Sequence, residues 1–142
     1  MRARMLRDLP PDGAWDVKLR PGGQIEVEFI AQVLQLIHAH EAPGLCSPTT
    51  RVALTRLADA GKLPPDDAAM LIHADHVWRT LQGMLRITVG RGARDELPDA
   101  SALALLRAVG GAVDLETLQA TLDDLAQQVR AMFVRHIGEI PT

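Results

Sequence analysis

The chain has 142 residues, of which 47% are hydrophobic, so its length and composition fit one domain with a single buried core. Its formal net charge is -3, which gives no electrostatic reason to expect nucleic acid or an anionic membrane as a partner. The one cysteine, Cys46, excludes an internal disulfide and a cysteine-rich zinc site, and is ordinary for a reducing cytoplasm. No stretch is apolar over enough residues to span a membrane. We therefore expect a soluble, cytoplasmic protein.

The residues before the first long helix are predicted to form little regular structure. Residues 2–7 are typical of the last turn of a helix, and the proline pair after them would end it. Apolar and polar residues alternate from Trp15 to Leu19, which predicts one short extended segment or strand. After a turn that contains two glycines, apolar residues recur at helical spacing from Ile25 to about His40.

Four further helices are predicted from caps and from apolar periodicity. Gly61 stands where a left-handed residue would end one of them, and residues 89–98 are predicted to form a loop. The last helix has the most regular apolar stripe of the chain. The predicted limits are Ser47, Thr49 or Thr50 to Ala60, Pro64 to about Gly90, Asp99 or Ser101 to Gly110, and Asp114 to the C-terminal tail. The predicted fold class is all-α, a helical bundle of about five helices in a single domain, residues 1–142.

Polar residues crowd the turn that leads into the first long helix. Its two glycines permit a positive φ and close backbone approach, and the helix N-terminus beyond them offers N–H groups and a partial positive charge. Two carboxylates in the first turn would repel a phosphate bound there, so a simple phosphate cradle is a poor interpretation. The candidate residues for a surface that faces a nucleotide on an adjoining domain are Lys18, Arg20, Gly22, Gly23 and Glu28.

The helical phase separates the two carboxylates of that first turn. Glu28 lies on a polar face, whereas Glu26 lies inside the apolar arc and is expected to be buried. A buried carboxylate needs partners, and we predict that Arg79 or Arg86 from the long helix pairs with it. The network of Glu26, Arg79 and Arg86 then has two interpretations. It fixes how two helices pack, or its neighbours form part of a nucleotide-facing site.

Other candidate sites have little support in the sequence. His73, Asp75 and His76 lie within one helical turn, but a metal site needs three or four ligands and no second cluster accompanies them. Cys46 has no evident base beside it, so it is not predicted to be a nucleophile. The sequence therefore predicts no metal and no catalytic residue within these 142 positions. The alternative is a small metal-dependent hydrolase that uses His73, Asp75 and His76, with further ligands from other helices.

The polar stretch and the residues after it form an ordered succession that reaches beyond the glycine turn. The elements are Lys18, Gly22-Gly23, Glu26-Val27-Glu28-Phe29 and Gln32, then Leu34-Gln35-Leu36, His38-Ala39-His40, Ala60-Gly61, Trp78 to Gln82 and Arg86 to Thr88. This succession resembles the segment that comes after each nucleotidyltransferase fold in the glutamine synthetase adenylyltransferase family. The sequence departs from the family pattern at Glu26, where the family usually has Asp, and at Gln24, where it usually has an aliphatic residue.

The resemblance implies an enzyme of two tandem halves, each a nucleotidyltransferase fold and then a helical domain like this one. In that family one half transfers AMP from ATP to a tyrosine of glutamine synthetase, and the other removes it by phosphorolysis. PII-type signal proteins and glutamine set the balance. The catalytic elements of the family, a Gly-Ser turn and an Asp-x-Asp pair that holds magnesium, do not occur in this sequence.

The resemblance therefore implies a C-terminal fragment that lies after a missing nucleotidyltransferase domain, where ATP and Mg2+ would bind. Alone, it is expected to be inactive. The closing helix and short tail favour the adenylylating half. The alternative is a stand-alone helical protein-interaction module, since a helical bundle by itself says little about function.

Overall fold

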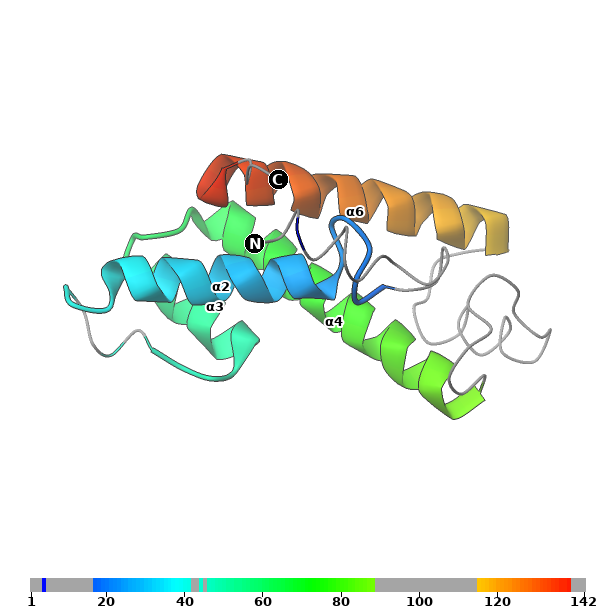
Figure 1. Cartoon of the computed structure of the whole chain (residues 1–142), viewed down its shortest axis with the longest axis horizontal. Coiled ribbons are helices and arrows are strands. Elements are labelled where there is room, and N and C mark those ends of the chain that lie inside the picture. Colours follow the sequence, from blue (N-terminus) through cyan, green and yellow to red (C-terminus); the bar gives the residue numbers. More distant parts are fainter. Residues whose placement is uncertain (1–3, 5–16, 42–43, 45, 89–114, 139–142) are drawn as a thin grey trace.

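The computed structural model describes residues 4, 17–41, 44, 46–88 and 115–138, which contain four helices and no strand (Figure 1). The helices are α2 (Gln24–His38), α3 (Thr50–Asp59), α4 (Pro65–Thr88) and α6 (Leu115–Ile137). The prediction of an all-α fold is confirmed for this part of the chain. The predicted helix that would end at Gly110, the predicted loop at residues 89–98 and the expected cap Asp114 lie outside the described residues.

The central position of α2 organises the fold. It contacts α3, α4 and α6, and α4 contacts the same two outer helices. Figure 1 shows α6 running along one side of α2 in the same direction, α3 on the other side, and α4 running back across them. Among the described helices, α3 and α6 do not contact each other, so α2 and α4 join the two sides of the molecule.

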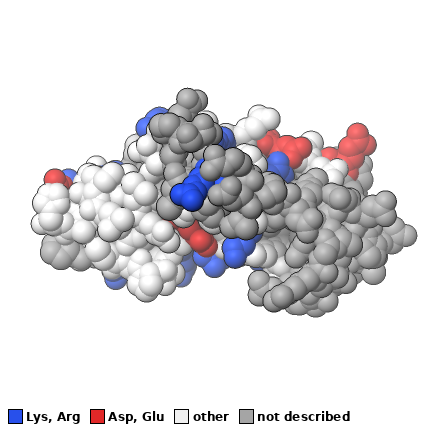
Figure 2. All heavy atoms as spheres, in the orientation of Figure 1, with Lys and Arg blue, Asp and Glu red and all other residues white. Residues whose placement is uncertain are grey.

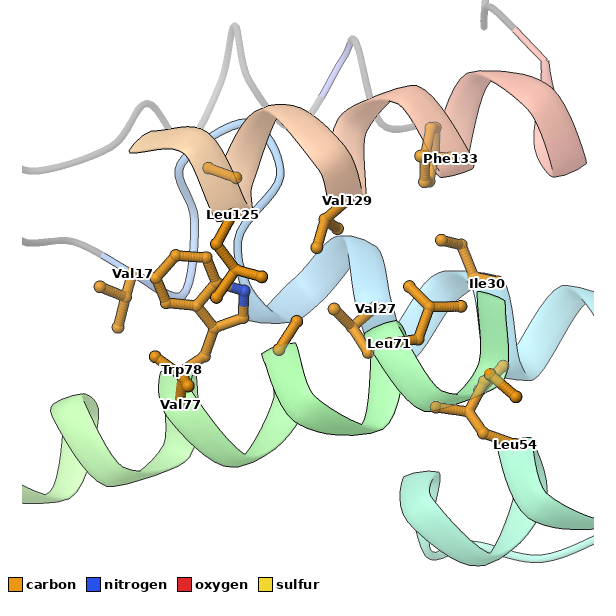
Figure 3. Close-up of a cluster of buried hydrophobic side chains, with 14 of the residues drawn as sticks. Val17, Val27, Ile30, Leu54, Leu71, Val77, Trp78, Leu125, Val129 and Phe133 are labelled. Carbon is orange, nitrogen blue, oxygen red and sulfur yellow. The ribbon is translucent and has the colours of Figure 1, made fainter. Parts of the chain in front are cut away.

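The apolar stripes of the helices meet in one core. Trp78 is fully buried and its indole ring extends from α4 toward α6, where Leu125 lies beside it (Figure 3). On α4 and α6 the structure buries the faces predicted from helical periodicity, whereas on α2 two residues of the apolar spacing that begins at Ile25 are exposed, Leu36 at 78% and Ile37 at 52%. The buried side chains of those predicted faces are Ala74, Val77, Trp78 and Leu81 on α4, and Leu118, Leu122, Leu125, Val129 and Phe133 on α6. No helix in the described ranges combines the length and the apolar character needed to cross a membrane.

The end of α3 confirms the prediction made for Gly61. This residue has a φ of +74°, and its N–H donates to the carbonyl of Ala58 at 3.0 Å. The N–H of Lys62 donates to the carbonyl of Leu57 at 2.9 Å. This pair of hydrogen bonds around a left-handed residue is the Schellman arrangement, which satisfies the last carbonyls of a helix.

The prediction of an extended segment at Trp15–Leu19 is wrong for the residues of it that the structure describes. Val17, Lys18 and Leu19 form turns. The reason is that the carbonyls of Val17 and Lys18 turn back to accept hydrogen bonds from the start of α2, which an extended strand could not do. A few alternating residues do not specify this closure.

Candidate functional site

The segment that precedes α2 caps the helix with its own backbone. The N–H of Gln24 donates to the carbonyl of Val17 at 2.8 Å, and the N–H of Ile25 donates to the carbonyl of Lys18 at 3.1 Å. The N-cap residue Gly23 makes no side-chain cap, because it has none to offer. Two of the amide groups that a helix N-terminus leaves unpaired are therefore used within the chain. These two N–H groups are therefore not available to bind an anion such as phosphate.

Both glycines of the turn are buried, and their neighbours belong to this domain. Gly22 has a φ of +76°, and a Cβ on it would lie 1.9 Å from the carbonyl oxygen of Ala126 in α6. A Cβ on Gly23 would lie 2.4 Å from the carbonyl oxygen of Val17. Close backbone approach was predicted for this turn, and the backbones that approach are its own and that of α6. Internal packing thus accounts for both glycines.

Glu26 is completely buried, and the ion pair that the structure describes for it is with Arg130 of α6. The Nη1 of Arg130 donates to Oε1 of Glu26 at 2.9 Å. The sequence predicts Arg79 or Arg86 of α4 as the partner, whereas this guanidinium comes from α6. The described ion pairs of Arg79 are with Asp75 and Glu28, and the side chain of Arg86 lies outside the described residues.

Glu28 belongs to a second network, between α2 and α4. Its Oε1 accepts from Nε2 of Gln24 at 3.2 Å and from Nη2 of Arg79 at 3.4 Å. The Nε of Arg79 also donates to both carboxylate oxygens of the buried Asp75, at 2.9 and 3.0 Å. Glu28 and Arg79 remain partly exposed, so this network borders the surface while Glu26 does not.

The two basic residues of the segment differ in their surroundings. Arg20 donates from Nη2 to Oδ1 of Asp123 in α6 at 2.8 Å, whereas Lys18 is exposed. In the space-filling view, acidic and basic side chains gather near the middle of the visible face (Figure 2). Of the predicted nucleotide-facing residues, the structure brings Lys18, Arg20 and Glu28 to the surface or its border, and it buries Gly22 and Gly23.

Two clefts adjoin these networks. One of about 470 Å³ lies between α4 and the start of α3, and Asp75, His76 and Arg79 line it. The other, of about 380 Å³, lies between Arg20 and Arg130. Within the described ranges, no group of three or more His, Cys, Asp or Glu side chains is arranged to hold a metal ion. What the arrangement offers is ion pairing and surface charge rather than a nucleophile with a base.

Sequence reasoning missed Arg130 and Asp123. Both lie on α6 beside its apolar stripe, and the guanidinium of Arg130 sits over the ring of Phe133 at 5.2 Å from the centroid. The available signal was a basic residue three positions before a core aromatic. Periodicity shows that such a residue borders the core, but it does not show which carboxylate faces it across more than 100 residues of chain.

The model of the protein family described as GlnD PII-uridylyltransferase matches residues 2–137. The chain belongs to this GlnD PII-uridylyltransferase family. The match covers the glycine turn, the four described helices and the ion pairs between them.

Relatives of this family member carry a different name, bifunctional glutamine synthetase adenylyltransferase/adenylyl-removing enzyme. The one from Rhodopseudomonas palustris strain CGA009 is 35% identical over 97% of the chain, and the one from Caulobacter vibrioides is 35% identical over 94%. A third, from Bradyrhizobium diazoefficiens, is 31% identical over 94%. The resemblance to glutamine synthetase adenylyltransferases is confirmed. The chain spans only 13–14% of the length of these relatives.

Proposed function

We propose that this chain is an accessory helical domain of an enzyme that transfers AMP from ATP to a tyrosine of glutamine synthetase and removes it by phosphorolysis. The observation that carries the proposal is the 35% identity to an adenylyltransferase over nearly the whole chain but only 14% of that relative. Such a match fits one part of a larger enzyme. The parent would regulate nitrogen assimilation in the cytoplasm.

The described residues support an accessory role rather than a catalytic one. The carboxylates at the start of α2 are held in ion pairs by Arg130 and Arg79, so both are used within this domain. ATP and magnesium would then be bound by an upstream nucleotidyltransferase domain. In this proposal Lys18, Arg20 and Glu28 meet that domain, and glutamine synthetase and a PII protein are the protein partners.

A chimera tests this function. The matching segment of the Rhodopseudomonas enzyme is replaced by the 142-residue chain, and transfer of labelled AMP from ATP to glutamine synthetase is measured with Mg2+ present. We expect the chimera to retain transfer activity within about tenfold of the relative, because a similar domain presents the same segment. The chain alone is expected to transfer nothing.

The matched control is the relative with that segment deleted, which should lose activity. An active deletion protein, or an inactive but folded chimera, would contradict the accessory role and favour a stand-alone interaction module. The family name also points to a second reaction, uridylyl transfer to PII. Parallel assays with UTP and PII as substrates distinguish the two, since label on PII instead of glutamine synthetase would reassign the parent.

A further inference from the structure

Three contacts join the segment 17–28 to one face of α6. Asp123, Ala126 and Arg130 are spaced three and four residues apart, so they lie along a single face of the helix. Their partners come in the same order along the segment. The contacts are Arg20 with Asp123, Gly22 with Ala126, and Glu26 with Arg130. We refer to the residues 17–28 as the glycine segment.

The three contacts are unequal in strength. Asp123 is 60% exposed, and an ion pair so open to solvent contributes little. The Gly22 contact is one of shape, with no attractive group. Only the Glu26 contact buries a charge completely, and a buried charge depends strongly on its partner. Of these three contacts, the one between Glu26 and the guanidinium of Arg130 therefore contributes most to holding the glycine segment on α6.

The orientation of Arg130 is itself fixed by the core. Its guanidinium lies 5.2 Å from the centroid of the Phe133 ring, and Phe133 is 1% exposed. A planar guanidinium can stack on a ring and donate to a carboxylate at the same time, which a lysine ammonium does less well. Arg130 thus links Glu26 to the Phe133 ring, which is held in the core.

Within the glycine segment, the turn is joined to the first residues of α2, because the carbonyls of Val17 and Lys18 accept hydrogen bonds from Gln24 and Ile25. We propose that Arg130 is a positioning residue that sets where the glycine segment sits on α6, and hence where the exposed Lys18 and the partly exposed Glu28 are presented. Arg130 itself contacts no reacting group in this role. It acts through Glu26.

Amide hydrogen exchange in the full 142-residue chain tests the proposal. The variant Glu26→Gln/Arg130→Met removes both charges together, so no buried carboxylate is left facing a lost guanidinium. We expect the amides of Gln24 and Ile25 to exchange about tenfold faster, while amides in the middle of α4 keep their protection. Unchanged exchange at Gln24 and Ile25, or an equal acceleration in all helices, would overturn the proposal.

The matched control is Arg135→Met, five residues after Arg130 and near the C-terminal end of α6. Arg135 donates to Asp67 at 2.6 Å, which joins α6 to α4 instead of to the glycine segment. Exchange at Gln24 and Ile25 should be unaltered in this control, and a rise equal to that of the double variant would overturn the proposal. If the double variant does not fold, Arg130→Lys replaces it. We expect the same faster exchange at Gln24 and Ile25, and exchange at the wild-type rate would overturn the proposal.

A kinetic arm rests on the proposed function. In an active chimera, Arg130→Lys should lower kcat for AMP transfer about tenfold and leave the KM for ATP and glutamine synthetase unchanged, because the glycine segment is misplaced at the reacting step. Arg135→Met should keep the kcat of the chimera. An unaffected kcat in the Arg130→Lys chimera overturns the positioning role. An inactive wild-type chimera instead contradicts the proposed function, and the exchange experiment still decides the role of Arg130.

Discussion

Gly22 and Gly61 adopt the same left-handed backbone in different surroundings. Their φ angles are +76° and +74°, so a side chain would be strained at either position. At Gly22 a Cβ would also lie 2.8 Å from Cα of Ala126, whereas nothing lies within 4 Å of a Cβ at Gly61. The pair therefore separates the cost of a backbone conformation from the cost of a steric contact.

Alanine substitutions at these two positions should differ in their effect on stability. We expect Gly61→Ala to lower the free energy of unfolding by about 1 kcal/mol, from the left-handed backbone alone. Gly22→Ala should lower it by about 3 kcal/mol or more, because the backbone of α6 must also move away. Urea unfolding of the two variants measures both values. Equal losses would mean that α6 does not press on the glycine turn as described.

At the scale of elements, the ends of α2 and α3 are held together at the surface. Glu41 comes shortly after α2, and Nζ of Lys62, just after α3, lies 3.0 Å from its Oε2. The hydrogen bond from Lys62, then its charge, and then His38 lower the pKa of Glu41 below its ordinary value. A lowered carboxyl pKa favours the folded state above the unfolded pKa, and this contribution is lost as the pH falls through the folded value.

The substitution Lys62→Met should return the pKa of Glu41 toward its ordinary value. A titration of the Glu41 carboxyl carbon by NMR measures the shift in wild type and variant. Because Glu41 is exposed, the wild-type shift should shrink at about 1 M salt, where surface charges are screened. A pKa that is the same in both proteins would show that Lys62 is not its cause. Arg56→Met, which removes a guanidinium that donates to the carbonyl of Cys46, serves as a control.

Sequence patterns predicted the limits of the described helices well and the side-chain contacts between them poorly. α2 was expected at Ile25 to about His40 and is found at Gln24–His38, since apolar spacing and glycine turns mark helix limits locally. The described partner of Glu26, Arg130 of α6, is one that the sequence does not predict. Helical phase indicates that a carboxylate is buried, but the partner depends on how distant helices pack, which local spacing does not encode.

At the scale of the whole molecule, the last described helix, α6, packs on the first, α2. It supplies the fully buried Phe133 to the core and ends against α4, where Nε2 of His136 lies 2.9 Å from Asp67. Its neighbour Val134 is 37% exposed. Adjacent residues of one helix therefore differ sharply in how much of the fold depends on them.

Truncation of these two neighbours should show how far the fold depends on α6. Phe133→Ala should lower the free energy of unfolding by about 3–5 kcal/mol, because a large cavity opens in the shared core. Val134→Ala should change it by no more than about 0.5 kcal/mol. Thermal unfolding should show one transition in each variant, as expected for a domain of this size. A separate early transition in Phe133→Ala would show that α6 unfolds independently of the rest.

The backbone cap on α2 has a consequence for the order of folding. Val17 and Gln24 are seven residues apart, so their hydrogen bond closes only a short loop. The contacts with α6 span 103 and 104 residues. Closing the longer loop costs about 2 kcal/mol more in chain entropy. We therefore expect local contacts to form first and docking on α6 to come late, so substitutions in the Arg130 contact should change the unfolding rate more than the folding rate.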